Sequence, residues 1–168
     1  METKVWIIGS SSGIGLELVK LCLQSNHKVI ASSRNAKKSE ELLQLKSTYT
    51  NKLELLDIDV SSNESVTKCV EEAFTVFNDL DICFFNAGVY DSMPLEQWDI
   101  SGCEAFMITN YLGACRILKP LVSYLEKQKK EFRVILNASL WSYFGLPYGG
   151  AYSASKAALV NLAQSIQP

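Results

Sequence analysis

The feature that most constrains the fold is a regular alternation of short apolar runs with longer stretches of helical periodicity. Runs rich in Val, Ile, Leu and Phe lie at 4–8, 28–31, 53–58, 81–85 and 132–136. Stretches with the period of an amphipathic helix follow them, at 13–25, 37–48, 63–77, 99–129 and 151–166. Strands that are apolar on both sides are expected where helices cover both faces of a parallel sheet. The sequence therefore predicts a three-layer α/β/α fold with a doubly wound parallel sheet of five strands (a Rossmann fold), in one domain over residues 1–168.

The composition narrows the classes of function. Of the 168 residues 48% are hydrophobic and 20% are charged, which suits one globular domain. The net charge of -2 leaves no excess of cations to neutralise a polynucleotide, so we expect no nucleic-acid partner. The first apolar run, Val5 to Ile8, is too short for a signal sequence or a membrane span, so we expect a cytoplasmic protein without a membrane partner.

The cysteines favour free thiols over a metal site or a disulfide framework. They are scattered, form no CxxC pair and do not cluster with His27, the only histidine. Packing in a reduced interior is their expected role, and no metal is predicted. The five are Cys22, Cys69, Cys83, Cys103 and Cys115.

A glycine-rich turn, Gly9-Ser10-Ser11-Ser12-Gly13-Ile14-Gly15, joins the first predicted strand to the first helix. A phosphate could meet free N–H groups and the positive end of a helix dipole there. Glycine lets the chain turn tightly, lets a pyrophosphate approach the backbone and lets the helix pack close to the strand. The predicted cofactor contacts in this turn are Gly9, Ser11, Ser12, Gly13, Ile14 and Gly15.

The same turn also spells G-x-S-x-G around Ser11, the pattern of a hydrolase nucleophile elbow. That machinery needs a histidine late in the chain. His27 lies just past the first helix, where we expect an exposed turn, so the hydrolase interpretation lacks its partner.

The second predicted strand ends at Arg34, about where a dinucleotide fold places the residue that reads the adenosine ribose. An acid there would accept hydrogen bonds from the ribose of NAD, whereas the guanidinium fork of Arg34 suits the 2'-phosphate of NADP. Lys37 and Lys38 add positive charge. A solvated basic helix start is the alternative, but cations at a helix N-terminus are mildly unfavourable without an anion. We therefore expect NADP(H) to be preferred over NAD(H).

Tyr152 and Lys156 are four residues apart in a predicted helix, so their side chains share one face. A phenol can act as an acid or base, and a nearby ammonium stabilises the phenolate. Ser139 follows the fifth predicted strand, on the edge where open α/β sheets bind ligands. Its hydroxyl could donate to a substrate oxygen, although a serine that ends a strand is also common.

The order and spacing of these motifs resemble the short-chain dehydrogenase/reductase family over the whole chain. The glycine motif of the family matches Gly9, Gly13 and Gly15. Its adenine-contacting acid and the residue after it match Asp59 and Val60, and its Asn-Ala-Gly motif matches Asn86, Ala87 and Gly88.

The family's catalytic residues match Asn110, Ser139, Tyr152 and Lys156. The resemblance implies that Tyr152 exchanges a proton with the substrate oxygen, that Ser139 orients this oxygen and that Asn110 holds a relay water. It also places Tyr152 and Lys156 among the cofactor contacts, Lys156 through the nicotinamide ribose. Hydride would pass between the nicotinamide and a carbonyl or alcohol carbon of a small molecule.

Three features depart from the family pattern. Ile8 stands where the family usually has Thr, and Phe85 replaces the first Asn of Asn-Asn-Ala-Gly. The sequence also stops at Pro168, before the further strands and the substrate-covering segment of family members, which indicates a truncated part of a longer protein or a degenerate form. The rival interpretations are a non-catalytic NADP-binding or interaction protein of the same fold and an extended family member such as a sugar-nucleotide epimerase.

Aromatic and apolar residues lie in the loops expected to border the site. They suggest an apolar or aromatic carbonyl substrate, although core packing would also explain several of them. Helices 99–129 and 151–166 could pair across a two-fold axis, so a homodimer or tetramer is expected. The loop residues are Tyr90, Trp98, Trp141, Tyr143, Leu146 and Tyr148.

Overall fold

Five parallel strands form one sheet in the order β3-β2-β1-β4-β5 in a computed structural model that describes residues 2–128 and 130–167. The crossover between β3 and β4 reverses the direction in which strands are added, which confirms the doubly wound fold. The strands are β1 (Lys4–Ile8), β2 (Lys28–Ser33), β3 (Leu53–Asp57), β4 (Ile82–Phe85) and β5 (Arg133–Leu136).

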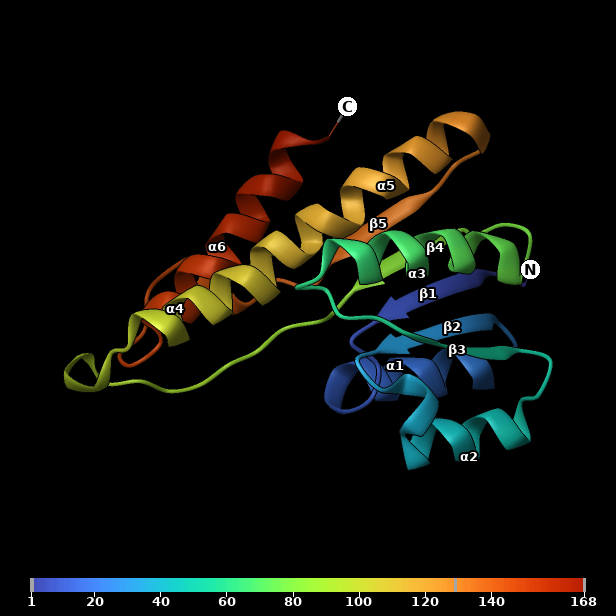
Figure 1. Cartoon of the computed structure of the whole chain (residues 1–168), viewed down its shortest axis with the longest axis horizontal. Coiled ribbons are helices and arrows are strands. Elements are labelled where there is room, and N and C mark those ends of the chain that lie inside the picture. The colour runs from blue at the N-terminus through green and yellow to red at the C-terminus, as the bar shows by residue number, and fades with distance from the viewer. Residues whose placement is uncertain (1, 129, 168) are drawn as a thin grey trace.

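Helices cover both faces of the sheet (Figure 1). One apolar core lies between the sheet and α1 and α2, and the other lies between the sheet and α3, α5 and α6. This arrangement explains why the strands are apolar on both sides. The helices are α1 (Gly13–Gln24), α2 (Glu40–Thr48), α3 (Asn63–Val76), α4 (Ile100–Phe106), α5 (Gly113–Gln128) and α6 (Gly150–Ser165).

Two predicted helices differ in their bounds. The helix expected at 99–129 consists of α4 and α5 joined by the π-helical segment Met107–Leu112. The helix expected at 37–48 begins only at Glu40, after a 3₁₀ turn at Ala36–Lys38. Ser39 caps α2 by accepting the N–H of Leu42, and two acidic residues occupy the first turn, where the helix dipole favours negative charge. The basic residues therefore do not form the helix start.

Trp6 lies at the centre of the sheet with no solvent exposure. Its indole Nε1–H donates to Ser32 Oγ on the adjacent strand over 2.9 Å, a buried hydrogen bond. The polar Ser32 within an apolar strand thereby satisfies a donor that would otherwise be costly to bury.

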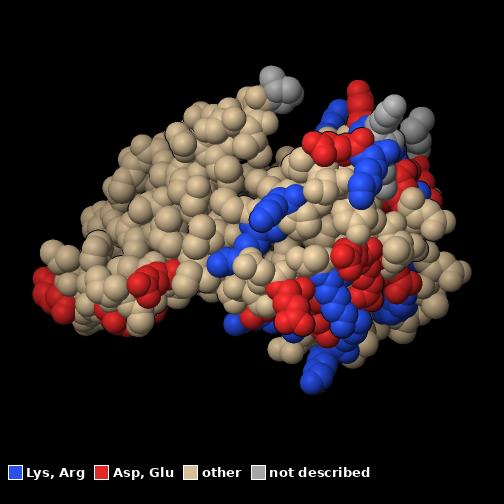
Figure 2. All heavy atoms as spheres, turned by 45° about the horizontal axis from the view of Figure 1, so that its top comes forward, with Lys and Arg blue, Asp and Glu red and all other residues tan. Residues whose placement is uncertain are grey.

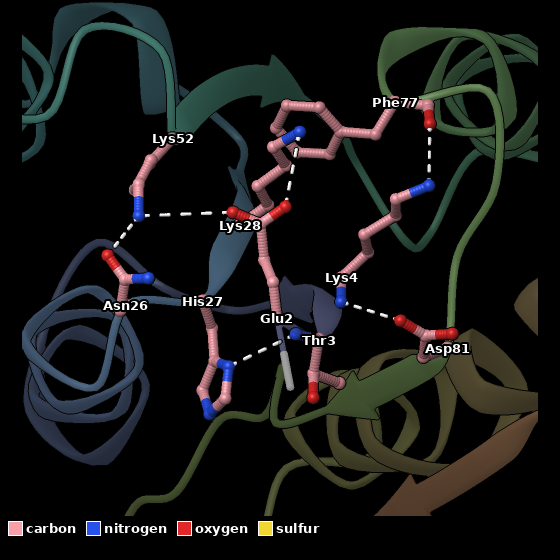
Figure 3. A network of polar contacts seen from close by, with 9 residues as sticks. All are labelled: Glu2, Thr3, Lys4, Asn26, His27, Lys28, Lys52, Phe77 and Asp81. Carbon is pink, nitrogen blue, oxygen red and sulfur yellow. Dashed lines mark hydrogen bonds and ion pairs between the residues drawn. The ribbon is translucent and has the colours of Figure 1, made fainter.

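A polar network ties the amino-terminal ends of the strands together, at the edge opposite the cavity described below (Figure 3). The backbone N–H of Lys4 donates to Asp81 Oδ2 over 2.8 Å, and its Nζ donates to the carbonyl of Phe77. His27 is half-buried, not exposed as expected, because its Nδ1 accepts the N–H of Thr3 over 3.1 Å. The histidine therefore has a structural partner at the far edge of the sheet.

All five cysteines are free thiols, as the sequence predicted. Cys69 and Cys83 are buried, and burial raises the pKa of Cys69 to about 12 and that of Cys83 further. Both thiols are therefore protonated at neutral pH and pack as small apolar groups. Within the described residues, no helix combines the length and apolar character needed to cross a bilayer.

Candidate dinucleotide and catalytic site

A cavity of about 510 Å³ opens at the carboxyl ends of β1 to β4, where a doubly wound sheet binds its ligands. Most of the predicted cofactor contacts lie on its wall. They are Gly9, Ser11, Ser12, Arg34, Asp59, Val60, Asn86, Ala87 and Gly88.

The glycine turn follows β1 as a tight bend. Gly9 has φ +87°, and a Cβ there would lie 2.5 Å from the backbone nitrogen of Ala87. A Cβ on Gly15 would lie 2.0 Å from the carbonyl oxygen of Gly9. Five predicted cofactor contacts stand away from the described cavity wall: Gly13, Ile14, Gly15, Tyr152 and Lys156. Ile14 is 67% exposed. Gly15 is thus required by helix packing against the turn.

The amino end of α1 is open toward the cavity. Ser12 is its N-cap in an extended conformation and makes no side-chain cap hydrogen bond among the described residues. Both Ser11 and Ser12 line the cavity beside the amino end of α1, so their hydroxyls are donors suited to a phosphate.

The cationic side of the cavity consists of Arg34 and Lys38. The side chain of Lys37 points elsewhere, because its Nζ lies 3.9 Å from Glu72 Oε1. The backbone N–H of Lys37 donates to Asp57 Oδ1. Ser33, also on the wall, buries an Oγ that finds no hydrogen-bond partner among the described residues. Two cations and an unused hydroxyl therefore converge at the end of β2.

Asp59 provides the carboxylate of the wall. Its Oδ1 accepts from the Ser61 hydroxyl over 2.6 Å and from the Ser61 N–H over 2.9 Å. These hydrogen bonds hold the pKa of Asp59 below its usual value, so the group is an ionised acceptor at neutral pH.

A chain of hydrogen bonds runs from the glycine turn to Lys156. Asn86 Nδ2 donates to the carbonyl of Gly9 over 2.8 Å, and Asn137 Nδ2 donates to Asn86 Oδ1 over 2.7 Å. Lys156 Nζ then donates to the carbonyl of Asn137 over 2.8 Å. Sequence reasoning missed Asn137, and the available signal was an amide at the end of a strand, two residues before Ser139.

Lys156 and Tyr152 lie together on α6, as their spacing predicted. Lys156 is only 4% exposed, and this burial lowers the pKa of its ammonium to about 8. Its Nζ is 5.9 Å from the centre of the Tyr152 ring. The ammonium and the phenol therefore lie on one face of α6.

Asn110 is fully buried within the π-helical segment. Its Oδ1 accepts the N–H of Val89 over 2.8 Å, and its Nδ2 donates to the carbonyl of Val89 and to Ser155 Oγ. The Ser155 hydroxyl donates to the carbonyl of Tyr152 over 2.7 Å. The side chain of Asn110 thus joins the loop after β4 to the turn of α6 that carries Tyr152.

Aromatic rings surround Tyr152 edge to face. The ring centres of Tyr90 and Trp141 lie 4.9 and 5.7 Å from that of Tyr152, and the ring of Phe106 lies at 6.4 Å. The fit of Trp141 depends on Gly149, where a Cβ would lie 2.4 Å from the indole. Ser139 begins the 3₁₀ turn that carries Trp141, so the serine, the indole and the phenol belong to one region.

The comparisons with known proteins agree with this architecture. The family model described as short chain dehydrogenase matches residues 3–168. The chain is 35% identical to estradiol 17-beta-dehydrogenase 1 of Rattus norvegicus over 98% of its length and 49% of that protein. It is 31% identical to 3beta-hydroxysteroid dehydrogenase 2 of Eggerthella lenta over 95% of its length and 62% of that protein. The solved structure of ElxO with NADP bound superposes with a TM-score of 0.87 at 25% identity, over 96% of this chain and 65% of that one.

A doubly wound parallel sheet with a glycine-rich turn after its first strand defines a protein of the Rossmann class of folds. Within that class, the chain belongs to the short-chain dehydrogenase family. It spans about half to two thirds of the length of the relatives described above and matches their amino-terminal part.

Proposed function

We propose that this chain, as one domain over residues 1–168, supplies the NADP(H) site and the catalytic side chains of an oxidoreductase that acts on carbonyl or alcohol groups. The observation that carries the proposal is the chain of hydrogen bonds from Gly9 through Asn86 and Asn137 to Lys156. It links the turn suited to a pyrophosphate with the lysine beside the phenol of Tyr152. The cofactor and the proton donor would therefore be held in a fixed position relative to each other.

The residues on the cavity wall fit NADP(H). The amino end of α1 with Ser11 and Ser12 would hold the pyrophosphate, and Asp59 would accept a hydrogen bond from the adenine. Arg34 and Lys38 would hold the 2'-phosphate, and no carboxylate of the β2 end competes with them on the described wall. The bound nicotinamide would supply or accept the hydride.

The protein side chains would handle the proton. Tyr152 would donate it to, or remove it from, the substrate oxygen, with the ammonium of Lys156 beside its ring. Ser139 would donate a hydrogen bond to the same oxygen and fix its position. Asn110, with its side-chain amide engaged by Val89 and Ser155, would position α6 and hold the relay water.

An apolar substrate with a ring system fits the surroundings of Tyr152. Tyr90 and Trp141 flank the phenol, and Leu140 and Tyr148 expose 68% and 61% of their surface nearby in sequence. The names of two relatives, estradiol 17-beta-dehydrogenase and 3beta-hydroxysteroid dehydrogenase, point to alcohols of this kind. Estradiol is therefore the first probe.

The test is oxidation of estradiol with NADP+ by the whole chain, followed by nicotinamide absorbance, beside fluorescence titration with NADPH and NADH. We expect tighter binding of NADPH and a turnover that Tyr152→Phe abolishes while NADPH binding persists. NADPH binding without turnover of estradiol or its ketone would refute the steroid assignment. Binding of neither nucleotide would refute the cofactor assignment.

We also propose a homodimer or tetramer through the helical region of 99–129 and 151–166. In α6 the only charged residue is the buried Lys156, and Figure 2 shows a broad surface without charged side chains on the side of the molecule that holds α6. Charge depletion is a mark of the centre of an interface. Sedimentation should give at least a dimer, and a monomer at micromolar concentration would refute the proposal.

A further inference from the structure

The short 3₁₀ turn Leu140–Ser142 is held at its start by the side chains of Ser139 and Ser142, each of which accepts a backbone N–H. Ser139 Oγ accepts the N–H of Trp141 over 3.2 Å. In return, Ser142 Oγ accepts the N–H of Ser139 over 3.1 Å. This reciprocal pair is a capping box on a turn of only three residues.

The capping box restricts the direction in which the Ser139 hydroxyl can donate its hydrogen. A hydroxyl has one donor hydrogen and two lone pairs, and one lone pair of Ser139 Oγ is taken by Trp141 N–H. The hydrogen is left to point away from that N–H, where a substrate oxygen could receive it. Ser142 fixes the backbone of Ser139, from which the Ser139 side chain projects, because its Oγ accepts the Ser139 N–H.

The same turn also places an aromatic ring. The backbone N–H that Ser139 holds belongs to Trp141, whose indole meets Tyr152 edge to face with ring centres 5.7 Å apart. A loosened turn would therefore move both the serine hydroxyl and one wall around the phenol.

We propose that Ser142 is a positioning residue of this site: through its hydrogen bond from Ser139 N–H it fixes the direction of the Ser139 hydroxyl and the place of Trp141 against Tyr152. Ser142 itself is half-buried and acts through Ser139. The catalytic consequence rests on the proposed function, whereas the structural consequence can be measured without any turnover.

The experiment compares the whole chain with Ser142→Ala, Ser142→Thr and Ser142→Cys. Threonine keeps the acceptor oxygen, and cysteine offers a weaker sulfur acceptor. Ser47→Ala is the matched control, because Ser47 also makes a local bond, to the carbonyl of Gln44, but lies on α2 far along the chain from the site. The first readout is hydrogen exchange at the amides of Ser139 and Trp141, measured by NMR.

We expect Ser142→Ala to speed exchange at both amides about tenfold, as loss of one hydrogen bond would, with Ser142→Cys between it and the wild type. Ser142→Thr and Ser47→Ala should leave both rates unchanged. Equal exchange in the wild type and Ser142→Ala would overturn the proposal, whether or not the chain is active.

The second readout is NADP+-linked oxidation of estradiol. Ser142→Ala should lower kcat about tenfold with a smaller change in KM and an unchanged Kd for NADPH, and Ser142→Thr should restore kcat. Unchanged kcat with faster exchange would also overturn the proposal, since the turn would then be held without consequence for the reaction. If the wild type does not oxidise estradiol, the steroid assignment fails, and the exchange rates still decide whether Ser142 holds the turn.

Discussion

The Nζ of Lys156 on α6 donates a hydrogen bond of 2.8 Å to the carbonyl oxygen of Asn137, just after β5. The ammonium has this neutral acceptor and an aromatic ring near it, and only 4% of the residue is exposed. A buried cation held by a carbonyl dipole is poorly compensated for its lost hydration, which is the cause of its lowered pKa.

The first prediction concerns the dependence of stability on pH. Because folding lowers the pKa of Lys156 from 10.5 to about 8, the unfolded chain binds the proton more strongly between these values. Relative to Lys156→Met, the wild type should therefore gain stability as pH rises from 8 to 10.5, by at most about 3 kcal/mol. Urea unfolding at several pH values measures the difference in the free energy of unfolding between the two proteins. The titration of the thiols contributes equally to both and drops out of this difference. A difference that does not vary with pH would show that Lys156 keeps its ordinary pKa.

The second prediction concerns the asparagine that joins the two halves of the site. Asn137→Ala keeps the carbonyl that Lys156 uses but removes the amide that donates to Asn86. Asn86 then holds the carbonyl of Gly9 less firmly, so we expect a Kd for NADPH raised about tenfold. Isothermal titration measures the affinity, and Asn161→Ala on the exposed part of α6 is the control. Equal affinities would mean that the amide has no influence on the glycine turn.

The third prediction separates the basic residues after β2. Arg34→Ala should weaken NADPH binding about ten- to a hundredfold and leave NADH binding nearly unchanged, because a charge-assisted bond to the 2'-phosphate is lost. Lys37→Ala should change neither, since the side chain of Lys37 faces Glu72. Fluorescence titration of both variants with both nucleotides is the measurement. An equal loss for NADPH and NADH in Arg34→Ala would contradict a role in phosphate recognition.

The fourth prediction concerns the packing of α1 against the glycine turn. A methyl group on Gly15 would lie 2.0 Å from the carbonyl oxygen of Gly9, which cannot withdraw without opening the turn. Gly15→Ala should cost about 2 kcal/mol or more in stability, as overpacking does. Gly145→Ala is the matched control, since a Cβ there meets nothing within 4 Å of the described structure. Thermal unfolding of the two variants is the measurement, and similar melting temperatures for Gly15→Ala and Gly145→Ala would contradict the predicted clash.

The sequence predicted the sheet and the position of the cavity because both follow from periodicity and from short motifs at strand ends. It did not predict the π-helical segment, because apolar residues recur through 99–129 without a break and the widened turn depends on packing around Asn110. It grouped both Lys37 and Lys38 with Arg34 as positive charge, whereas only Lys38 lies with Arg34 on the cavity wall. Lys37 lies in the 3₁₀ turn, and its side chain is directed toward Glu72 and not toward Arg34.

The roles of Asn137 and Ser142 lay outside sequence reasoning for a related reason. Each acts through a hydrogen bond whose geometry depends on the loop conformation, and polar residues after a strand are common without such a role. The partners of Asn137 come from positions 51 residues before it and 19 residues after it. Only the folded sheet brings them together.

The tryptophans of this chain form two separate fluorescence reporters, the buried Trp6 in the sheet and the pair Trp98 and Trp141 in the loops. Trp6 is sealed in the sheet and bonded to Ser32, whereas Trp98 is 46% exposed and Trp141 lies against Tyr152. With Trp98 and Trp141 replaced by Phe, emission will follow global unfolding of the sheet. With Trp6 replaced by Phe, it will follow the loops alone. The chain can thus report separately whether these loops open before the sheet does.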